Sequence, residues 1–181
     1  MSTAKSLLIG LRGSGKTTVG RRVAEELGVE FIDLDERVRE AFGGVDISTV
    51  FQQQGEPAFR ARESSELSRV MDEPIDAVVA LGGGTPTAPG VDDFLRSSKE
   101  RGRALIVYLR ADPDVLARRL LDTGIGEDRP SLTGGDPIEE IREVFDRRDP
   151  LYRALADAEV DASCTTEHVV SDVVSAVRDR S

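Results

Sequence analysis

The chain has 181 residues, which suits one domain, and 39% of them are hydrophobic, which is enough for a buried core. No run of about 18 apolar residues occurs, so we expect no membrane-spanning helix. The 34 acidic residues outnumber the 24 basic ones, and the resulting net charge of −10 argues against general binding to nucleic acid.

Short apolar segments alternate along the chain with segments of helical periodicity. In chain order we predict a strand at residues 6–10, a helix at 16–27, a strand at 31–32, helices at 35–42, 48–53 and 57–70, a strand at 77–81, a helix at 91–98, a strand at 104–109, helices at 113–121 and 137–149, a strand at 158–160 and a helix at 167–177. Pro150 is expected to end the helix before it. This alternation predicts an α/β fold, in which a parallel sheet is covered by helices on both faces. Ligand sites in such folds lie beyond the carboxyl ends of the strands, so a motif that follows a strand is a candidate.

The strongest motif follows the first predicted strand. Residues 10–17 read Gly-Leu-Arg-Gly-Ser-Gly-Lys-Thr, which fits the phosphate-binding pattern G-x-x-x-x-G-K-[ST]. Its glycines let backbone amides turn toward phosphate oxygens, and the following helix points its positive end at the same place. In such a loop Lys16 contacts the β- and γ-phosphates, and the Thr17 hydroxyl joins the Mg²⁺ shell. We therefore predict an ATP site that consists of Gly13, Ser14, Gly15, Lys16, Thr17 and Thr18.

A phosphate loop alone does not distinguish a kinase from a GTPase or a motor. The guanine-binding pattern Asn-Lys-x-Asp is missing from the sequence, and the chain is short for a motor. These observations favour a small-molecule kinase, which needs an acceptor site and a closing lid.

Two carboxylates come at the end of the second predicted strand. Strand alternation would put Asp33 and Asp35 on the same side. One carboxylate would then help to hold Mg²⁺, and the other would accept the acceptor's hydroxyl or its proton. The alternative is that Asp35 only caps the next helix.

The remaining candidates lie farther along the chain. Arg60 and Glu63 are three positions apart on a predicted helix, so Glu63 could orient the guanidinium toward a carboxylate, or the two could form an ordinary surface ion pair. Glycines 82–84 follow a predicted strand, where either a substrate approaches the backbone or the chain simply turns. Arg148 lies just before Pro150, where it could instead interact with the end of the helix dipole.

Residues 123–136 have the length and the glycine content of a lid. Closure of such a lid would exclude water from the reaction. Arg129 would then meet the charge on the transferring phosphoryl group, unless it is only a solvated loop arginine.

Taken in order, these motifs resemble the shikimate kinase family. Beyond the phosphate loop, the matching residues are Gly44, Ile47, Val50, Phe51, Gly55, Glu56, Phe59, Arg60, Glu63, Gly82, Gly83, Gly84, Arg129, Pro130, Arg148, Pro150, Leu151 and Tyr152. The resemblance covers about residues 6–161. It implies a three-layer P-loop kinase fold of the nucleoside-monophosphate-kinase type, with five parallel strands in the order 2-3-1-4-5. It also implies a single domain, residues 1–181, with a substrate-binding insertion at approximately 34–62 and the lid at approximately 123–136.

The resemblance further implies a reaction, which is transfer of the γ-phosphoryl of ATP to the 3-hydroxyl of shikimate in chorismate and aromatic amino-acid biosynthesis. Asp35 would bind the shikimate hydroxyls and act as the base, with Lys16 and Arg129 on the phosphates. Mg²⁺ would lie near Thr17 and Asp33, bound directly or through water. The shikimate site would consist of Asp35, Arg60, Glu63, Gly82, Gly83, Gly84 and Arg148.

Two segments depart from that family's pattern. Leu121-Asp122 stands at the lid entrance, where many members carry an arginine, and residues 163–167 contain no proline. How the adenine is held is therefore not predicted, and Arg118 or Arg119 could substitute.

We expect a cytoplasmic monomer that binds ATP and shikimate, but neither nucleic acid nor membrane. The N-terminal residues lack the pattern of a signal peptide, and Cys164 is the only cysteine. Two other functions stay open from the residues alone. One is a kinase for gluconate or a nucleotide, and the other is a non-catalytic nucleotide-binding regulator on the same fold.

Overall fold

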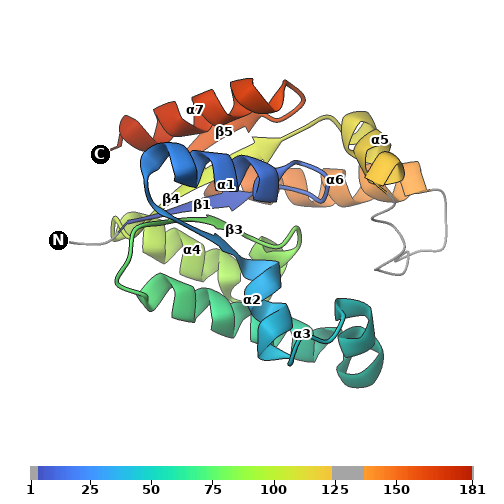
Figure 1. The fold of residues 1–181 in the computed structure, drawn as a ribbon. Helices are drawn as coiled ribbons and strands as arrows, with labels where there is room; N and C mark the ends of the chain where they lie inside the picture. Colours follow the sequence, from blue (N-terminus) through green and yellow to red (C-terminus); the bar gives the residue numbers. More distant parts are fainter. Residues whose placement is uncertain (1–3, 124–136, 181) are drawn as a thin grey trace.

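A five-stranded parallel sheet forms the centre of the protein (Figure 1). The computed structural model describes residues 4–123 and 137–180. The strands are β1 (Lys5–Ile9), β2 (Glu30–Asp33), β3 (Ala77–Ala80), β4 (Ala104–Arg110) and β5 (Ala158–Asp161). They pair in the order β2-β3-β1-β4-β5, which confirms the predicted α/β class and strand order.

Helices cover both faces of the sheet. They are α1 (Lys16–Leu27), α2 (Leu34–Ala41), α3 (Ile47–Asp72), α4 (Val91–Glu100), α5 (Pro113–Thr123), α6 (Pro137–Leu155) and α7 (Thr166–Arg178), with a short 3-10 helix, η1 (Thr85–Thr87). Helices α1 and α7 pack together on one face, and α4 and α6 pack on the other (Figure 1). Every residue of β1 and β3 is buried, as expected for central strands of a parallel sheet. No helix in the described part of the chain is both long enough and apolar enough to cross a membrane.

Helix α3 joins the two helices predicted at 48–53 and 57–70, with a break at Gly55. The backbone there has φ 80° and ψ 164°, a conformation that only glycine adopts readily. Pro57 follows in the first turn of the second helical segment, where a missing N–H costs little. The predicted interruption is therefore real, although the helix resumes at once.

The prediction that Pro150 ends its helix is wrong, because α6 continues through it to Leu155. A proline inside a helix costs about 3 kcal/mol, so tertiary packing must offset the loss. Tyr152 and Leu155, which follow the proline, are 0% and 1% exposed. Arg148 is therefore not at a helix end, and it lies one turn from Tyr152 on the same helix face.

Candidate active site

The phosphate-binding loop joins β1 to α1. Gly13 and Gly15 have φ of 79° and 87°, in the left-handed region that glycine tolerates. The Lys16 Nζ donates to the carbonyls of Gly10 at 2.8 Å and of Leu11 at 2.9 Å. The lysine thus folds back over its own loop, at the positive end of α1 where a phosphate would bind.

Asp33 connects the phosphate loop to the start of α2. The Thr17 hydroxyl donates to its Oδ2 at 2.8 Å. Its Oδ1 accepts from the backbone N–H groups of Asp35 at 3.0 Å and Glu36 at 3.4 Å, which caps the helix. A hydroxyl and a carboxylate side by side are oxygen ligands that suit Mg²⁺.

The prediction that strand alternation aligns Asp33 with Asp35 is wrong. Helix α2 begins at Leu34, so Asp35 lies in its first turn. The residue that caps α2 is Asp33, so the alternative in which Asp35 is the cap is also wrong. The Asp35 carboxylate instead lies against Gly82. A Cβ added to that glycine would be 2.6 Å from Asp35 Oδ1.

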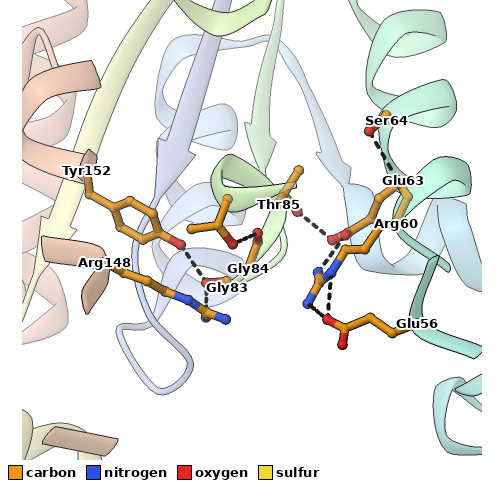
Figure 2. Close-up of polar contacts among 10 residues, drawn as sticks. Glu56, Arg60, Glu63, Ser64, Gly83, Gly84, Thr85, Arg148 and Tyr152 are labelled. Carbon is orange, nitrogen blue, oxygen red and sulfur yellow. Dashed lines mark hydrogen bonds and ion pairs between the residues drawn. The ribbon is translucent and has the colours of Figure 1, made fainter. Parts of the chain in front are cut away.

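Glu63 lies at the same glycine and is held firmly. The same added Cβ at Gly82 would lie 2.7 Å from Glu63 Oε1. That oxygen accepts from the Thr85 hydroxyl at 2.6 Å, and Glu63 is only 1% exposed. Its other oxygen, Oε2, accepts from Arg60 Nη1 at 2.7 Å, so Glu63 fixes that guanidinium (Figure 2). Although burial opposes the charge, Glu63 and Glu56 together raise the pKa of Arg60.

Arg148 reaches the glycine turn from α6, on the opposite side (Figure 2). Its Nη1 and the Tyr152 hydroxyl donate to the Gly83 carbonyl, at 2.8 Å and 2.7 Å. A Cβ added to Gly84 would lie 3.0 Å from both Arg60 Nη1 and Nη2, and 3.3 Å from Arg148 Nη2. Two guanidinium groups from distant helices therefore meet over one glycine.

The two guanidinium groups differ in their carboxylate partners. Glu63 and Glu56 pair with Arg60, but within residues 4–123 and 137–180 no carboxylate lies within 4.0 Å of Arg148. Burial, and with it the positive charges of Arg60 and Arg147, lowers the pKa of Arg148. An anion bound at Gly84 would give Arg148 the partner that it lacks, and two planar guanidinium groups match a carboxylate.

The anion site and the phosphate loop are neighbours. A Cβ added to Gly83 would lie 3.1 Å from the backbone N of Arg12 and 3.2 Å from its Cγ. Gly83 therefore contacts the phosphate loop, while its carbonyl accepts from Arg148 and Tyr152. An anion over Gly84 would lie next to a phosphate held by the loop.

A pocket of about 220 Å³ opens on the other side of the phosphate loop. Its lining residues are Gly13, Ser14, Gly15, Thr18, Val19, Arg119, Ala162, Cys164, Thr166 and Val169. Of the two arginines considered for adenine, Arg119 lines this pocket and Arg118 does not. The Arg119 Nη1 donates to the Gly13 carbonyl at 3.3 Å. Sequence reasoning missed Ala162 and Cys164, although their position directly after β5 was a usable signal.

The predicted lid and Arg129 lie outside the described residues. Sequence reasoning also gave no role to Thr85 or Tyr152. Both make hydrogen bonds that hold site residues in place. The spacing of Tyr152, four residues after Arg148, was the signal for a shared helix face, but the expected break at Pro150 hid it.

Comparison with known proteins agrees with this geometry. A family model described as "Shikimate kinase" matches residues 12–178. The chain belongs to the shikimate kinase family. It is 39% identical to the shikimate kinase of Thiobacillus denitrificans over 156 residues, which cover 86% of this chain and 80% of the relative. It is 37% identical to the shikimate kinase of Marinomonas sp. over 174 residues, which cover 95% and 91%.

Solved structures of shikimate kinases have the same fold. The shikimate kinase from Acinetobacter baumannii in complex with shikimate superposes with a TM-score of 0.81 at 31% identity, covering 98% of this chain and 92% of that one. A gluconokinase from Sinorhizobium meliloti has a TM-score of 0.60 at 20% identity, which shows a shared fold alone. The predicted family and the P-loop kinase fold are thereby confirmed.

Proposed function

We propose that this protein transfers the γ-phosphoryl group of ATP to the 3-hydroxyl of shikimate, giving shikimate 3-phosphate and ADP for chorismate and aromatic amino-acid biosynthesis. The observation that carries the proposal is the meeting of Arg60 and Arg148 at Gly84, next to the phosphate loop. A carboxylate-bearing acceptor fits that pair, whereas a neutral polyol would not need it. Membership of the shikimate kinase family supports the same acceptor.

The acceptor would be held at two ends. Arg60 and Arg148 would bind its carboxylate, and Glu63 would keep the Arg60 guanidinium in place. The reacting hydroxyl would then lie near Asp35, whose carboxylate packs against Gly82 in the same turn. Asp35 would accept the proton of that hydroxyl as the oxygen attacks the phosphorus.

The nucleotide would be held on the opposite side of the glycine turn. The residues in contact with ATP would be Gly13, Ser14, Gly15, Lys16, Thr17 and Thr18. Lys16 would leave the carbonyls of its loop and stabilise the charge on the transferring phosphoryl group. We place the adenine in the pocket beside Arg119. Arg129 would reach the phosphates from the lid.

The protein also offers ligands for Mg²⁺. Thr17 Oγ1 and Asp33 Oδ2 would contribute oxygen atoms, directly or through water. Bound there, the ion would neutralise charge on the β- and γ-phosphates. Asp33 already accepts three hydrogen bonds, which fixes its carboxylate next to the phosphate loop.

A coupled assay that measures ADP release, with shikimate, gluconate or AMP as the acceptor, tests the proposal. Turnover with shikimate alone is expected. The Arg60→Ala variant should raise the KM for shikimate with little change in the KM for ATP. Arg69→Ala is the matched control, because Arg69 lies on the same helix and is exposed. Turnover with another acceptor, in the absence of turnover with shikimate, would refute the assignment.

The same assay distinguishes this kinase from a non-catalytic regulator. Such a protein would bind ATP without releasing ADP in the presence of shikimate. The retained phosphate-loop lysine and both aspartates, Lys16, Asp33 and Asp35, argue for catalysis. We further propose a cytoplasmic monomer, for which light scattering of the purified protein measures the oligomeric state.

A further inference from the structure

Glu56 belongs to the segment that resembles the family, but the reaction described above gives it no role. Its Oε1 accepts from Arg60 Nε at 3.2 Å and from Arg60 Nη2 at 3.1 Å (Figure 2). These two donors form one edge of the guanidinium, and that edge can bind a carboxylate through parallel hydrogen bonds. Glu56 therefore occupies a position on Arg60 that suits the acceptor's carboxylate.

The two carboxylates on Arg60 are held very differently. Glu63 is buried, and Thr85 fixes its second oxygen. The Glu56 side chain is 54% exposed, and in the described part of the chain Arg60 is its sole hydrogen-bond or ion-pair partner. Exposed ion pairs contribute little to stability, so an incoming anion can displace Glu56 but not Glu63.

The backbone of α3 places Glu56 next to the Arg60 guanidinium. It follows directly on Gly55, where α3 breaks, and lies one helical turn before Arg60. Its charge reduces the net positive charge that Arg60 and Arg148 would otherwise concentrate at Gly84.

We propose that Glu56 acts as a built-in competitor for the acceptor's carboxylate and so contributes to acceptor specificity. The proposal rests on the proposed function, because it concerns the same acceptor. A carboxylate ligand replaces Glu56 on Arg60 and restores the charge balance of the pair. An uncharged polyol offers nothing in exchange, so Glu56 stays in place and the site remains closed to it.

The opposite role would be to hold Arg60 in position for the acceptor, and the two roles differ in the sign of one measurement. Removing a competitor lowers the KM for shikimate, whereas removing a support raises it. A Glu56→Gln variant makes this distinction because it removes the charge and keeps the size of the side chain. Glu56 is exposed, so the variant is expected to fold.

The experiment compares the wild type with Glu56→Gln and with Asp72→Asn at saturating ATP. Asp72 is the matched control, since it is an exposed carboxylate on the same helix that pairs with a different arginine, Arg103. We expect the KM for shikimate to fall about two- to fivefold in Glu56→Gln, or about 0.4–1 kcal/mol, with kcat and the KM for ATP unchanged. Benzoate, a carboxylate with no hydroxyl to phosphorylate, should inhibit the variant more strongly by the same factor.

A shikimate KM in Glu56→Gln that equals or exceeds the wild-type value overturns the inference and leaves the proposed function intact. Absence of turnover by the wild type with shikimate overturns the proposed function, and the inference with it. A fall in KM that also occurs in Asp72→Asn would reflect net charge alone and would equally overturn the role of Glu56.

Discussion

Replacement of Gly84 by alanine gives the sharpest test of the acceptor site. The added Cβ would lie 3.0 Å from both terminal nitrogens of Arg60 and 3.3 Å from Nη2 of Arg148. The backbone of Gly84 has φ −117° and ψ −6°, which lies outside the left-handed region that favours glycine, so alanine can adopt it. The change therefore perturbs the guanidinium pair while leaving the fold intact, and the free energy of unfolding should change by less than about 0.5 kcal/mol.

The size of the effect follows from these distances. Contacts at 3.0 Å with Arg60 and 3.3 Å with Arg148 require each guanidinium to retreat by a few tenths of an ångström. A displacement of about 1 Å at a positioning group can reduce turnover about a hundredfold, and the flexible ends of arginines absorb part of it. The shift here is smaller, so we expect kcat/KM for shikimate to fall about three- to tenfold, or about 0.7–1.4 kcal/mol.

The assay measures ADP release while shikimate and ATP are varied in turn, together with thermal unfolding. Gly83→Ala is the matched control, because its Cβ would lie 3.1 Å from the backbone N of Arg12 in the phosphate loop. That variant should raise the KM for ATP more than Gly84→Ala does. The reasoning is refuted if Gly84→Ala changes both KM values equally, or if the KM for shikimate stays within twofold of the wild type.

Three further predictions test other parts of the site. Asp35→Asn should reduce kcat about 10²- to 10⁴-fold while ATP affinity, measured by calorimetry, is retained; an equal loss of both would mean a structural role. Gly55→Ala should lower the free energy of unfolding in urea by about 1–3 kcal/mol, because φ 80° with ψ 164° is accessible to glycine alone, and an unchanged midpoint would contradict this. Burial raises the pKa of Tyr152 to about 12 from the ordinary 10.0, so the folded protein binds this proton more tightly than the unfolded chain. The associated stability is complete below pH 10 and is lost as the pH rises toward 12, and Tyr152→Phe should flatten that part of the pH curve of unfolding.

The sheet could be predicted because its signals are local. Each central strand contains a short aliphatic run, and the phosphate-loop motif indicates where the first strand ends and the first helix begins. The errors arose where tertiary packing overrides a local rule. Pro150 should end a helix by propensity, yet the buried Tyr152 keeps the chain helical beyond it. Asp35 leaves the strand pattern because α2, capped by the Asp33 carboxylate, begins at Leu34.

The residue types of the site were also readable from motif spacing, but their contacts were not. Arg60 and Arg148 come from α3 and α6, so their meeting at Gly84 depends on how the helices pack around the sheet. The same holds for Thr85, whose hydrogen bond to Glu63 links residues that no periodicity places together. Local pattern predicts which side chains have the right chemistry, and topology decides which of them touch.

The glycine turn after β3 sets the distances on which phosphoryl transfer would depend. Gly82 contacts the carboxylates of Asp35 and Glu63, Gly83 contacts the phosphate loop, and Gly84 contacts the guanidinium pair. In the proposed reaction, these three successive residues would define where the base, the nucleotide and the acceptor carboxylate lie relative to one another. In-line transfer needs the attacking oxygen within about 3–3.5 Å of the phosphorus. That range is narrower than the width of one side-chain carbon. A Cβ at any of the three positions would lie 3.1 Å or less from one of these neighbours, so the close packing of the site around the turn, rather than the backbone conformation, favours glycine there.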